Sequence, residues 1–181
     1  RVGRPDRDVE RDEREREAPG RRPPAGGPVD REREGDEPVE ADRRRAVLLT
    51  AQAQSMELSD QDQAGKLAEA AHGLAPNLVP AAEIAGRVLA AQGYVSRAAR
   101  LLAKTWELSP HPDIALTYAY VRPGDSPRDR LNRVRALTRN KPEHVESRVA
   151  VAAAAVEAHE WGEAREALEP LLAERPSHRV C

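Results

Sequence analysis

The chain has 181 residues, which is enough for one ordinary domain or a short array of repeats. One third of the residues are charged, but the net charge is only -2 and no basic stripe typical of a nucleic-acid-binding protein occurs. Phe is absent and aromatic residues make up 3% of the chain, so a core would consist of Ala, Leu and Val, which favours packed helices over sheets. The single cysteine, Cys181, cannot form an internal disulfide, and no Cys/His spacing predicts a metal site.

Residues 1–41 form a distinct segment. They alternate Arg with Asp and Glu over residues 11–17, and become rich in Pro and Gly over residues 21–28. Because they offer almost no apolar surface to bury, the entropy cost of ordering them cannot be offset, and we predict a disordered charged linker. The alternative is an electrostatic interaction tail, but such a tail usually carries one dominant sign of charge. The chain begins with Arg rather than Met, so we interpret it as part of a longer protein.

From residue 42 onward, apolar residues recur at spacings of three and four, which is typical of amphipathic helices. Pro and Gly breakers interrupt this pattern, and no segment alternates convincingly with a period of two. We therefore predict eight helices joined by short turns. The first two lie around residues 46–53 and 64–74, and the others over residues 79–92, 94–108, 112–121, 126–139, 143–158 and 161–173.

The prolines that end alternate helices repeat at regular intervals. Pro76, Pro110, Pro142 and Pro176 are separated by 34, 32 and 34 residues. A helix-turn-helix unit with a period of about 34 residues is typical of the tetratricopeptide repeat. Small residues also fall where the two helices of such a unit approach closely: Ala64, Gly86, Ala98, Ala152 and Ala164.

The third unit departs from this register. Tyr120 stands where Gly or Ala is usual, and Arg130 stands where Ala is expected, so we expect this helix pair to be splayed. The predicted fold is all-α, a tetratricopeptide-like α-solenoid over residues 42–181. In such a stack each pair covers the apolar face of the next, and the first helices of the pairs line a concave surface. That surface usually binds an extended peptide or a partner helix.

The concave wall is the predicted partner-binding site. Glu83 and Arg87 lie four residues apart on one helix face, where Arg87 could hold a carboxylate of a partner. The alternative is a surface ion pair that contributes about 0.2–0.5 kcal/mol. Thr117 and Glu146 would line the same wall in the next two units.

The sequence does not predict catalysis, because no nucleophile elbow accompanies its Ser, His and acidic residues. His111, between Pro110 and Pro112, has two interpretations. It could be an axial ligand of haem, or it could fix the turn before a helix. The second is favoured because the sequence offers no second ligand and no pocket. We expect Trp106 and Trp161 to pack in the core, and the remaining histidines to be exposed: His72, His144, His159 and His178.

Several stretches resemble the HemY-type tetratricopeptide proteins of proteobacteria. The most specific is the Pro-His-Pro-Asp element within the stretch Trp-Glu-Leu-Ser-Pro-His-Pro-Asp-Ile-Ala. The resemblance covers about residues 43–181, with matching stretches at residues 46–52, 74–82, 106–115, 161–172 and 179–181.

This resemblance implies a protein of the bacterial inner membrane, with a hydrophobic N-terminal anchor that is absent from this chain and a soluble repeat domain. It also implies a link to late haem biosynthesis as a scaffold or regulator, with haem-biosynthesis enzymes as partners. We therefore predict a non-catalytic scaffold that binds a protein partner, with no resident cofactor. The alternatives are an envelope adaptor without a role in haem synthesis, and a carrier that binds haem or porphyrin.

Overall fold

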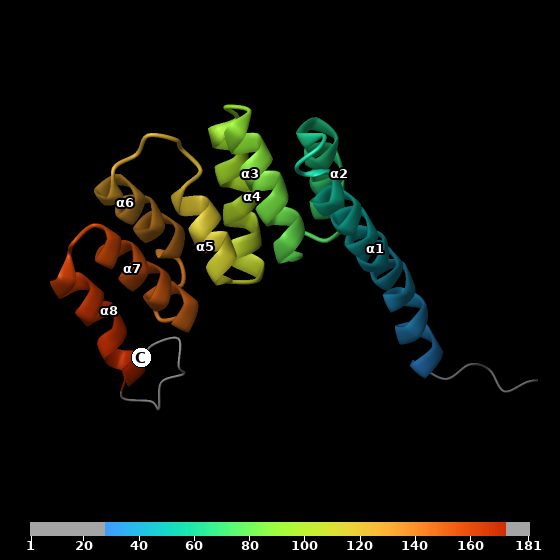
Figure 1. The fold of residues 1–181 in the computed structure, drawn as a ribbon. Coiled ribbons are helices and arrows are strands. Elements are labelled where there is room, and N and C mark those ends of the chain that lie inside the picture. The colour runs from blue at the N-terminus through green and yellow to red at the C-terminus, as the bar shows by residue number, and fades with distance from the viewer. Residues whose placement is uncertain (1–27, 173–181) are drawn as a thin grey trace, which may run out of the picture.

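The computed structural model describes residues 28–172, and this part of the chain is all-helical, with eight helices and no strand (Figure 1). The prediction of an all-α protein is confirmed, and seven of the helices lie within a few residues of their predicted positions. The helices are α1 (Pro28–Met56), α2 (Gln61–Leu74), α3 (Val79–Ala91), α4 (Val95–Leu108), α5 (Pro112–Ala119), α6 (Pro127–Thr138), α7 (Val145–Glu157) and α8 (Trp161–Leu172).

The first helix begins much earlier than the apolar pattern indicated. α1 starts at Pro28, so residues 28–41 of the predicted linker belong to a helix that continues through residue 41 without a break. Charged pairs one turn apart favour this extension: Arg44 Nε donates to Glu40 Oε1 at 3.2 Å. The remainder of the predicted linker lies outside the described residues, as does Cys181.

The length of α1 invites comparison with a membrane span. It has 29 residues, whereas about 20 predominantly apolar residues suffice to cross a bilayer. Many residues of α1 are charged, however. Across residues 28–172, the structure contains no helix that combines the length and the apolar character needed to cross a membrane.

Each helix packs against the next one along the chain, and the helix pairs follow one another in chain order (Figure 1). The first helices of successive pairs also touch: α3 contacts α1 and α5, and α5 contacts α7. The pair formed by α5 and α6 includes the shortest of the described helices, α5, with 8 residues. This arrangement places α3, α5 and α7 side by side.

Local sequence signals account for the helix ends. Asp60 accepts a hydrogen bond from the backbone nitrogen of Gln63 at 3.0 Å and so begins α2. Ser126 and Asp129 form a capping box at the start of α6. Gly93, which follows α3, has a φ of 85°, a left-handed conformation that costs glycine little. Capping side chains and the glycine after α3 therefore account for these helix ends.

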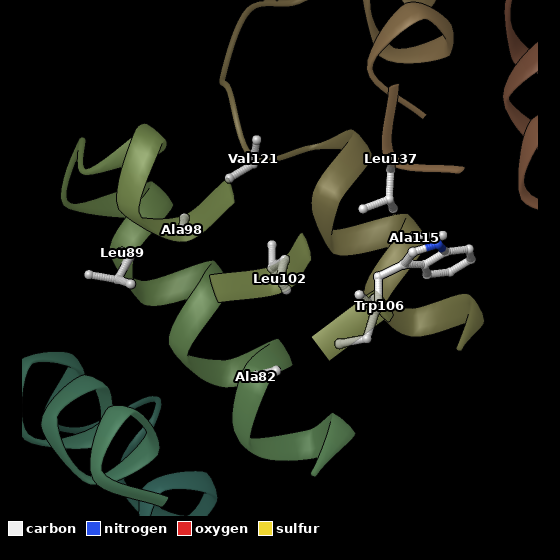
Figure 2. Packing of buried hydrophobic residues seen from close by; sticks show 9 residues of the cluster. Ala82, Leu89, Ala98, Leu102, Trp106, Ala115, Val121 and Leu137 are labelled. Atoms are coloured by element: carbon white, nitrogen blue, oxygen red, sulfur yellow. The ribbon is translucent and has the colours of Figure 1, made fainter. Parts of the chain in front are cut away.

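Alanine supplies much of the core, and the few large buried residues lie among it. Trp106 is 1% exposed and packs with Leu102, Ile114 and Ala115 where α3, α4 and α5 meet (Figure 2). This confirms the predicted core position of Trp106. Small side chains let helix axes approach closely, so a core without Phe can still reach the packing density of a protein interior.

Trp161 does not follow its prediction. It is 60% exposed, because it is the first residue of α8 and its ring lies at the helix end rather than on the packed face. The ring centroid of His159 lies 5.5 Å away. The core placement predicted for Trp161 was therefore wrong.

His72 was expected to be exposed, but it is buried in α2. Its Nε2 lies 3.1 Å from Oγ1 of Thr105 in α4, and this hydroxyl donates to the carbonyl oxygen of Pro76 at 2.9 Å. Because the hydroxyl donates to Pro76, it accepts from His72, which requires a proton on Nε2. The chain of bonds joins α2, α4 and the turn after α2. Burial, together with the charge of Lys104, lowers the pKa of His72.

Gly86 lies where α3 packs tightly against Leu102 of α4. A Cβ at this position would lie 2.9 Å from both Cδ atoms of Leu102, which is fully buried. Gly86→Ala should therefore lower the free energy of unfolding by about 1–3 kcal/mol, the usual cost of overpacking, despite the better helix propensity of Ala. Urea unfolding measures the change.

Gly73 in α2 is the matched control, because a Cβ there would meet nothing within 4 Å. Gly73→Ala should raise the free energy of unfolding by up to about 1 kcal/mol. Equal effects of Gly73→Ala and Gly86→Ala would contradict the close approach of α3 and α4.

The buried His72 predicts a dependence of stability on pH. Its pKa in the folded state is lowered, so the unfolded state binds more protons once the pH falls below about 6.5. The free energy of unfolding should be at its full value above that pH and should fall as the medium becomes more acidic. Urea unfolding across this range measures the slope, which His72→Gln should reduce. Equal slopes in the unchanged chain and in His72→Gln would refute the assignment to His72.

Candidate functional site

A small apolar groove lies between α5 and α7, and α6 contributes to its lining. Its volume is about 230 Å³, below the roughly 300–1,000 Å³ of pockets that bind drug-sized molecules. This space suits one or two protein side chains better than a tetrapyrrole. The lining residues are Pro112, Asp113, Ala115, Leu116, Ala119, Tyr120, Arg130, Val134, Glu146, Val149, Ala150, Ala153, Ala154 and Glu157.

Small side chains keep this groove open. α7 contributes Ala150, Ala153 and Ala154 to the lining, and α5 contributes Ala115 and Ala119. Since alanine has nothing beyond Cβ, neighbouring helices that carry it on their facing sides leave space that larger residues would fill. The groove therefore follows from the same alanine-rich composition that builds the core.

The groove offers apolar surface to a partner. Leu116 on the α5 side is 58% exposed, and Ala153 on the α7 side is exposed as well. Full burial of an exposed Leu contributes about 1.5–3 kcal/mol relative to leaving it in water. A side chain placed between these two helices would gain this kind of contact on both of its sides.

Tyr120, Arg130 and Glu157 form a cluster where α5 and α7 end. Tyr120 Oη donates to Glu157 Oε2 at 3.0 Å, and the guanidinium carbon of Arg130 lies 4.6 Å from the centre of the Tyr120 ring. Arg130 Nε lies 3.5 Å from Glu157 Oε2, which is an ion pair without hydrogen-bond geometry. The hydrogen bond to Glu157, together with partial burial and the negative charge of Glu157, raises the pKa of Tyr120, although the charge of Arg130 acts against this rise.

Contacts made by α6 and by the loop between α5 and α6 fix the position of Tyr120. Arg133 donates from Nη1 to the carbonyl oxygen of Ala119 at 3.0 Å and pairs through Nη2 with the carboxylate of Asp125. Both partners of this ion pair are largely buried. Val121, directly after Tyr120, is 1% exposed and packs in the core. The groove end is therefore anchored from both sides.

The other end of the groove combines two similar helix starts. His111 Nδ1 accepts from the backbone nitrogen of Asp113 at 3.3 Å, and His144 Nδ1 accepts from that of Glu146 at 3.1 Å. Each histidine is the N-cap of its helix, α5 or α7. The carboxylates of Asp113 and Glu146 lie in the first turns, where the helix dipole favours negative charge. Two acidic residues therefore line this end of the groove.

The structure brings one of the predicted partner-binding residues, Glu146, to the groove. Thr117 is half-buried on α5 but does not contribute to the lining, and Glu83 and Arg87 lie on the neighbouring helix α3. The predicted set therefore divides between two places on the surface.

Arg87 has carboxylate partners within the chain. It pairs with Glu83 one turn away, and it forms a bidentate contact with Glu57 in the turn after α1. Its Nε donates to Glu57 Oε1 at 3.0 Å, and its Nη2 donates to the two carboxylate oxygens at 2.8 and 3.0 Å. This geometry ties α3 to the first helix pair.

His111 lies where its structural interpretation placed it, at the turn before a helix. Its Nδ1 is used by the N-cap hydrogen bond, which leaves Nε2 as the other ring nitrogen. Among residues 28–172, His, Cys, Asp and Glu side chains form no group of three or more that could hold a metal ion.

No known family model and no curated protein match this chain. The interpretation of the groove therefore depends on its own geometry and chemistry.

Sequence reasoning found two members of the cluster and missed the third. Tyr120 and Arg130 were recognised as departures from the repeat, but Glu157 was not connected with them. The available signal was the separation of 37 residues between Tyr120 and Glu157, close to one repeat. The two residues meet because α5 and α7 touch.

The cluster predicts the titration of Tyr120. The chain has three tyrosines, and the hydrogen bond to Glu157 should make Tyr120 titrate at a higher pH than an ordinary tyrosine. Glu157→Gln removes the negative charge and should lower this pKa towards the usual value of about 10. The ultraviolet absorbance of tyrosinate measures the change.

Tyr120→Phe assigns the titration, because it should remove the component that ionises late. An unchanged titration curve in Glu157→Gln would show that Tyr120 is not held by Glu157 in solution.

Proposed function

We propose that this chain is a non-catalytic scaffold whose helix pairs form a tetratricopeptide-like α-solenoid. Two observations support this arrangement. The helix-ending prolines recur with a spacing near 34 residues, and the first helices α1, α3, α5 and α7 touch in succession. In an array of this kind the surface formed by the first helices is the usual place for a partner.

The observation that supports partner binding is the open apolar groove between α5 and α7. Both are first helices, so the groove lies on the surface at which repeat arrays bind extended peptides or helices. Its size accommodates side chains, and its walls are rigid helices rather than loops. A partner would insert an apolar side chain between Leu116 and Ala153.

The resemblance to HemY-type proteins supports a more specific proposal about the partner. In this proposal the partner is an enzyme of late haem biosynthesis, and the chain is held at the bacterial inner membrane by an anchor outside this sequence. The residues that support it are those of the Pro-His-Pro-Asp element, of which Pro112 and Asp113 line the groove.

A pull-down from native membranes tests the scaffold function. Ala153 is exposed in the groove, so Ala153→Glu should fill the groove with a charged side chain and reduce partner capture at least tenfold, the effect of losing about 1.4 kcal/mol of binding. Ala136→Glu, at an exposed site on α6 that does not line the groove, should capture as much as the unchanged chain. Mass spectrometry identifies and quantifies the bound proteins.

The identity of the captured proteins decides between the partner classes. Haem-synthesis enzymes that are lost with Ala153→Glu would support the specific proposal. Other envelope proteins lost in the same way would support the scaffold and refute the haem link. Capture that is equal for both variants would refute binding in the groove.

A further inference from the structure

A second groove lies between α2 and α4, the second helices of the first two pairs; we call it the α2–α4 groove. Its wide end has a volume of about 560 Å³ and its narrow end one of about 370 Å³, and the two ends share Glu69 of α2 and Arg97 of α4. None of the described residues lines both this groove and the one between α5 and α7. The two grooves are therefore separate surfaces.

Positive charge prevails in the α2–α4 groove. Four cationic side chains line it against two carboxylates, those of Asp62 and Glu69. One pair of charges cancels, because Arg97 Nη2 lies 2.9 Å from Glu69 Oε1 and so joins α4 to α2. The remaining cations are all exposed: Lys66, Arg100 and Lys104.

The fold leaves these three cations without a carboxylate partner. Among the side chains that the structure describes, Lys66 and Lys104 form no ion pair, and Arg100 donates only from Nε to the carbonyl oxygen of Ser96 at 3.3 Å. This bond leaves both Nη groups of Arg100 for a ligand. By contrast, the described arginines that join other helices across the repeat are matched by acidic residues. The α2–α4 groove thus carries charge that the fold does not use.

The wide end of the α2–α4 groove also offers apolar surface. Tyr94, at the start of α4, lines this end and is 58% exposed. Gly65 of α2 and Val88 and Leu89 of α3 supply the remaining apolar lining, and all three are buried. The volume at this end lies within the roughly 300–1,000 Å³ of ordinary binding pockets. It has room for a large side chain that packs against the ring of Tyr94.

We infer that the α2–α4 groove binds an acidic segment of a partner protein. Asp and Glu side chains of this segment pair with Lys66, Arg100 and Lys104, and one of its apolar side chains packs against Tyr94. The inference goes beyond the proposed binding between α5 and α7 and does not depend on it. It gives the array a second docking surface, formed by second helices and selective for the opposite charge.

An acidic protein segment fits this groove better than a nucleic acid does. Three available cations fall short of the roughly 6–10 phosphate contacts of a typical nucleic-acid-binding protein. Tyr94 is the one aromatic residue among those that line the groove within the described chain, whereas single-stranded nucleic acids usually stack their bases on several aromatic rings. The groove has the dimensions and chemistry for a few side chains of a peptide.

Selection from a library of displayed random peptides tests this inference. The bait is the full 181-residue chain. Peptides that also bind the triple variant Lys66→Gln, Arg100→Gln and Lys104→Gln are discarded. The remaining peptides should share Asp or Glu residues close to an apolar residue. Enrichment of basic or uncharged peptides, or the recovery of no peptide, would overturn the inference.

Fluorescence anisotropy with the most enriched peptide measures the contribution of the charges. The three cations are exposed, so each should contribute about two- to fivefold to the affinity, and the triple variant should bind about ten- to a hundredfold more weakly. Binding to the unchanged chain should weaken as salt is added, and the triple variant should show a smaller dependence on salt. A twenty-nucleotide single-stranded DNA that binds more tightly than the peptide would overturn the choice of a protein partner.

The matched control removes the same charge elsewhere. Its substitutions are at exposed arginines outside the α2–α4 groove: Arg122→Gln, Arg139→Gln and Arg165→Gln. This control should bind the peptide within about twofold of the unchanged chain. Circular dichroism verifies that both triple variants are folded. Equal binding by the two triple variants would overturn the inference.

The apolar contact has its own test. Tyr94→Ala should weaken peptide binding about two- to tenfold, since the partner loses the ring against which it packs. Leu108→Ala, which shortens an exposed apolar side chain of α4 outside the groove, should leave the affinity unchanged. Equal affinities of these two variants would refute the contact with Tyr94.

The variant Ala153→Glu separates this inference from the scaffold function. Ala153 lines only the groove between α5 and α7 among the grooves described, so Ala153→Glu should bind the selected peptide as tightly as the unchanged chain does. Loss of peptide binding in Ala153→Glu would place the acidic segment between α5 and α7 and overturn the inference. Partner capture that does not depend on Ala153 would refute binding in that groove and leave the α2–α4 groove as a docking surface.

Discussion

The close approach of helices at small residues is the constraint on which this structure depends. With no Phe in the chain, the core cannot be filled by large side chains, so the helices themselves must come together. Gly86 shows how near they come, since even a methyl group there would collide with Leu102. Alanine occupies many other buried positions, and Trp106 packs where α3, α4 and α5 meet. Each helix pair is consequently narrow and depends on its neighbours to cover it.

The same constraint produces the groove. Where alanines of neighbouring helices touch directly, they form part of the core. The alanines of α5 and α7 that line the groove instead face each other across an open space. The third pair differs from the others because Tyr120 and Arg130 replace small residues, and these two form a cluster with Glu157 instead of packing between α5 and α6. The cluster therefore lies beside the space that the alanines leave open.

Local signals explain which parts of the fold could be predicted. Prolines, the glycine after α3 and the capping residues act within one turn of the chain, so the sequence displays them directly. The sequence does not show contacts between helices in this direct way. The bidentate contact of Arg87 with Glu57 joins residues 30 positions apart, and His72 meets Thr105 across 33 positions. Exposure at helix ends is equally hidden, which is why Trp161 was misplaced. The contact of Tyr120 with Glu157, 37 positions apart, was missed for the same reason.

These long-range contacts also engage charged side chains on the surface of the first helices. A charged side chain can recognise a partner only if the fold has not already engaged it. On α3, Arg87 is held by two carboxylates and stabilises the junction between the first two pairs. At the groove, Arg130 of α6 pairs with Glu157 and lies against the ring of Tyr120. The motif of Glu and Arg four residues apart thus serves the fold on α3, because its arginine joins α3 to the first helix pair.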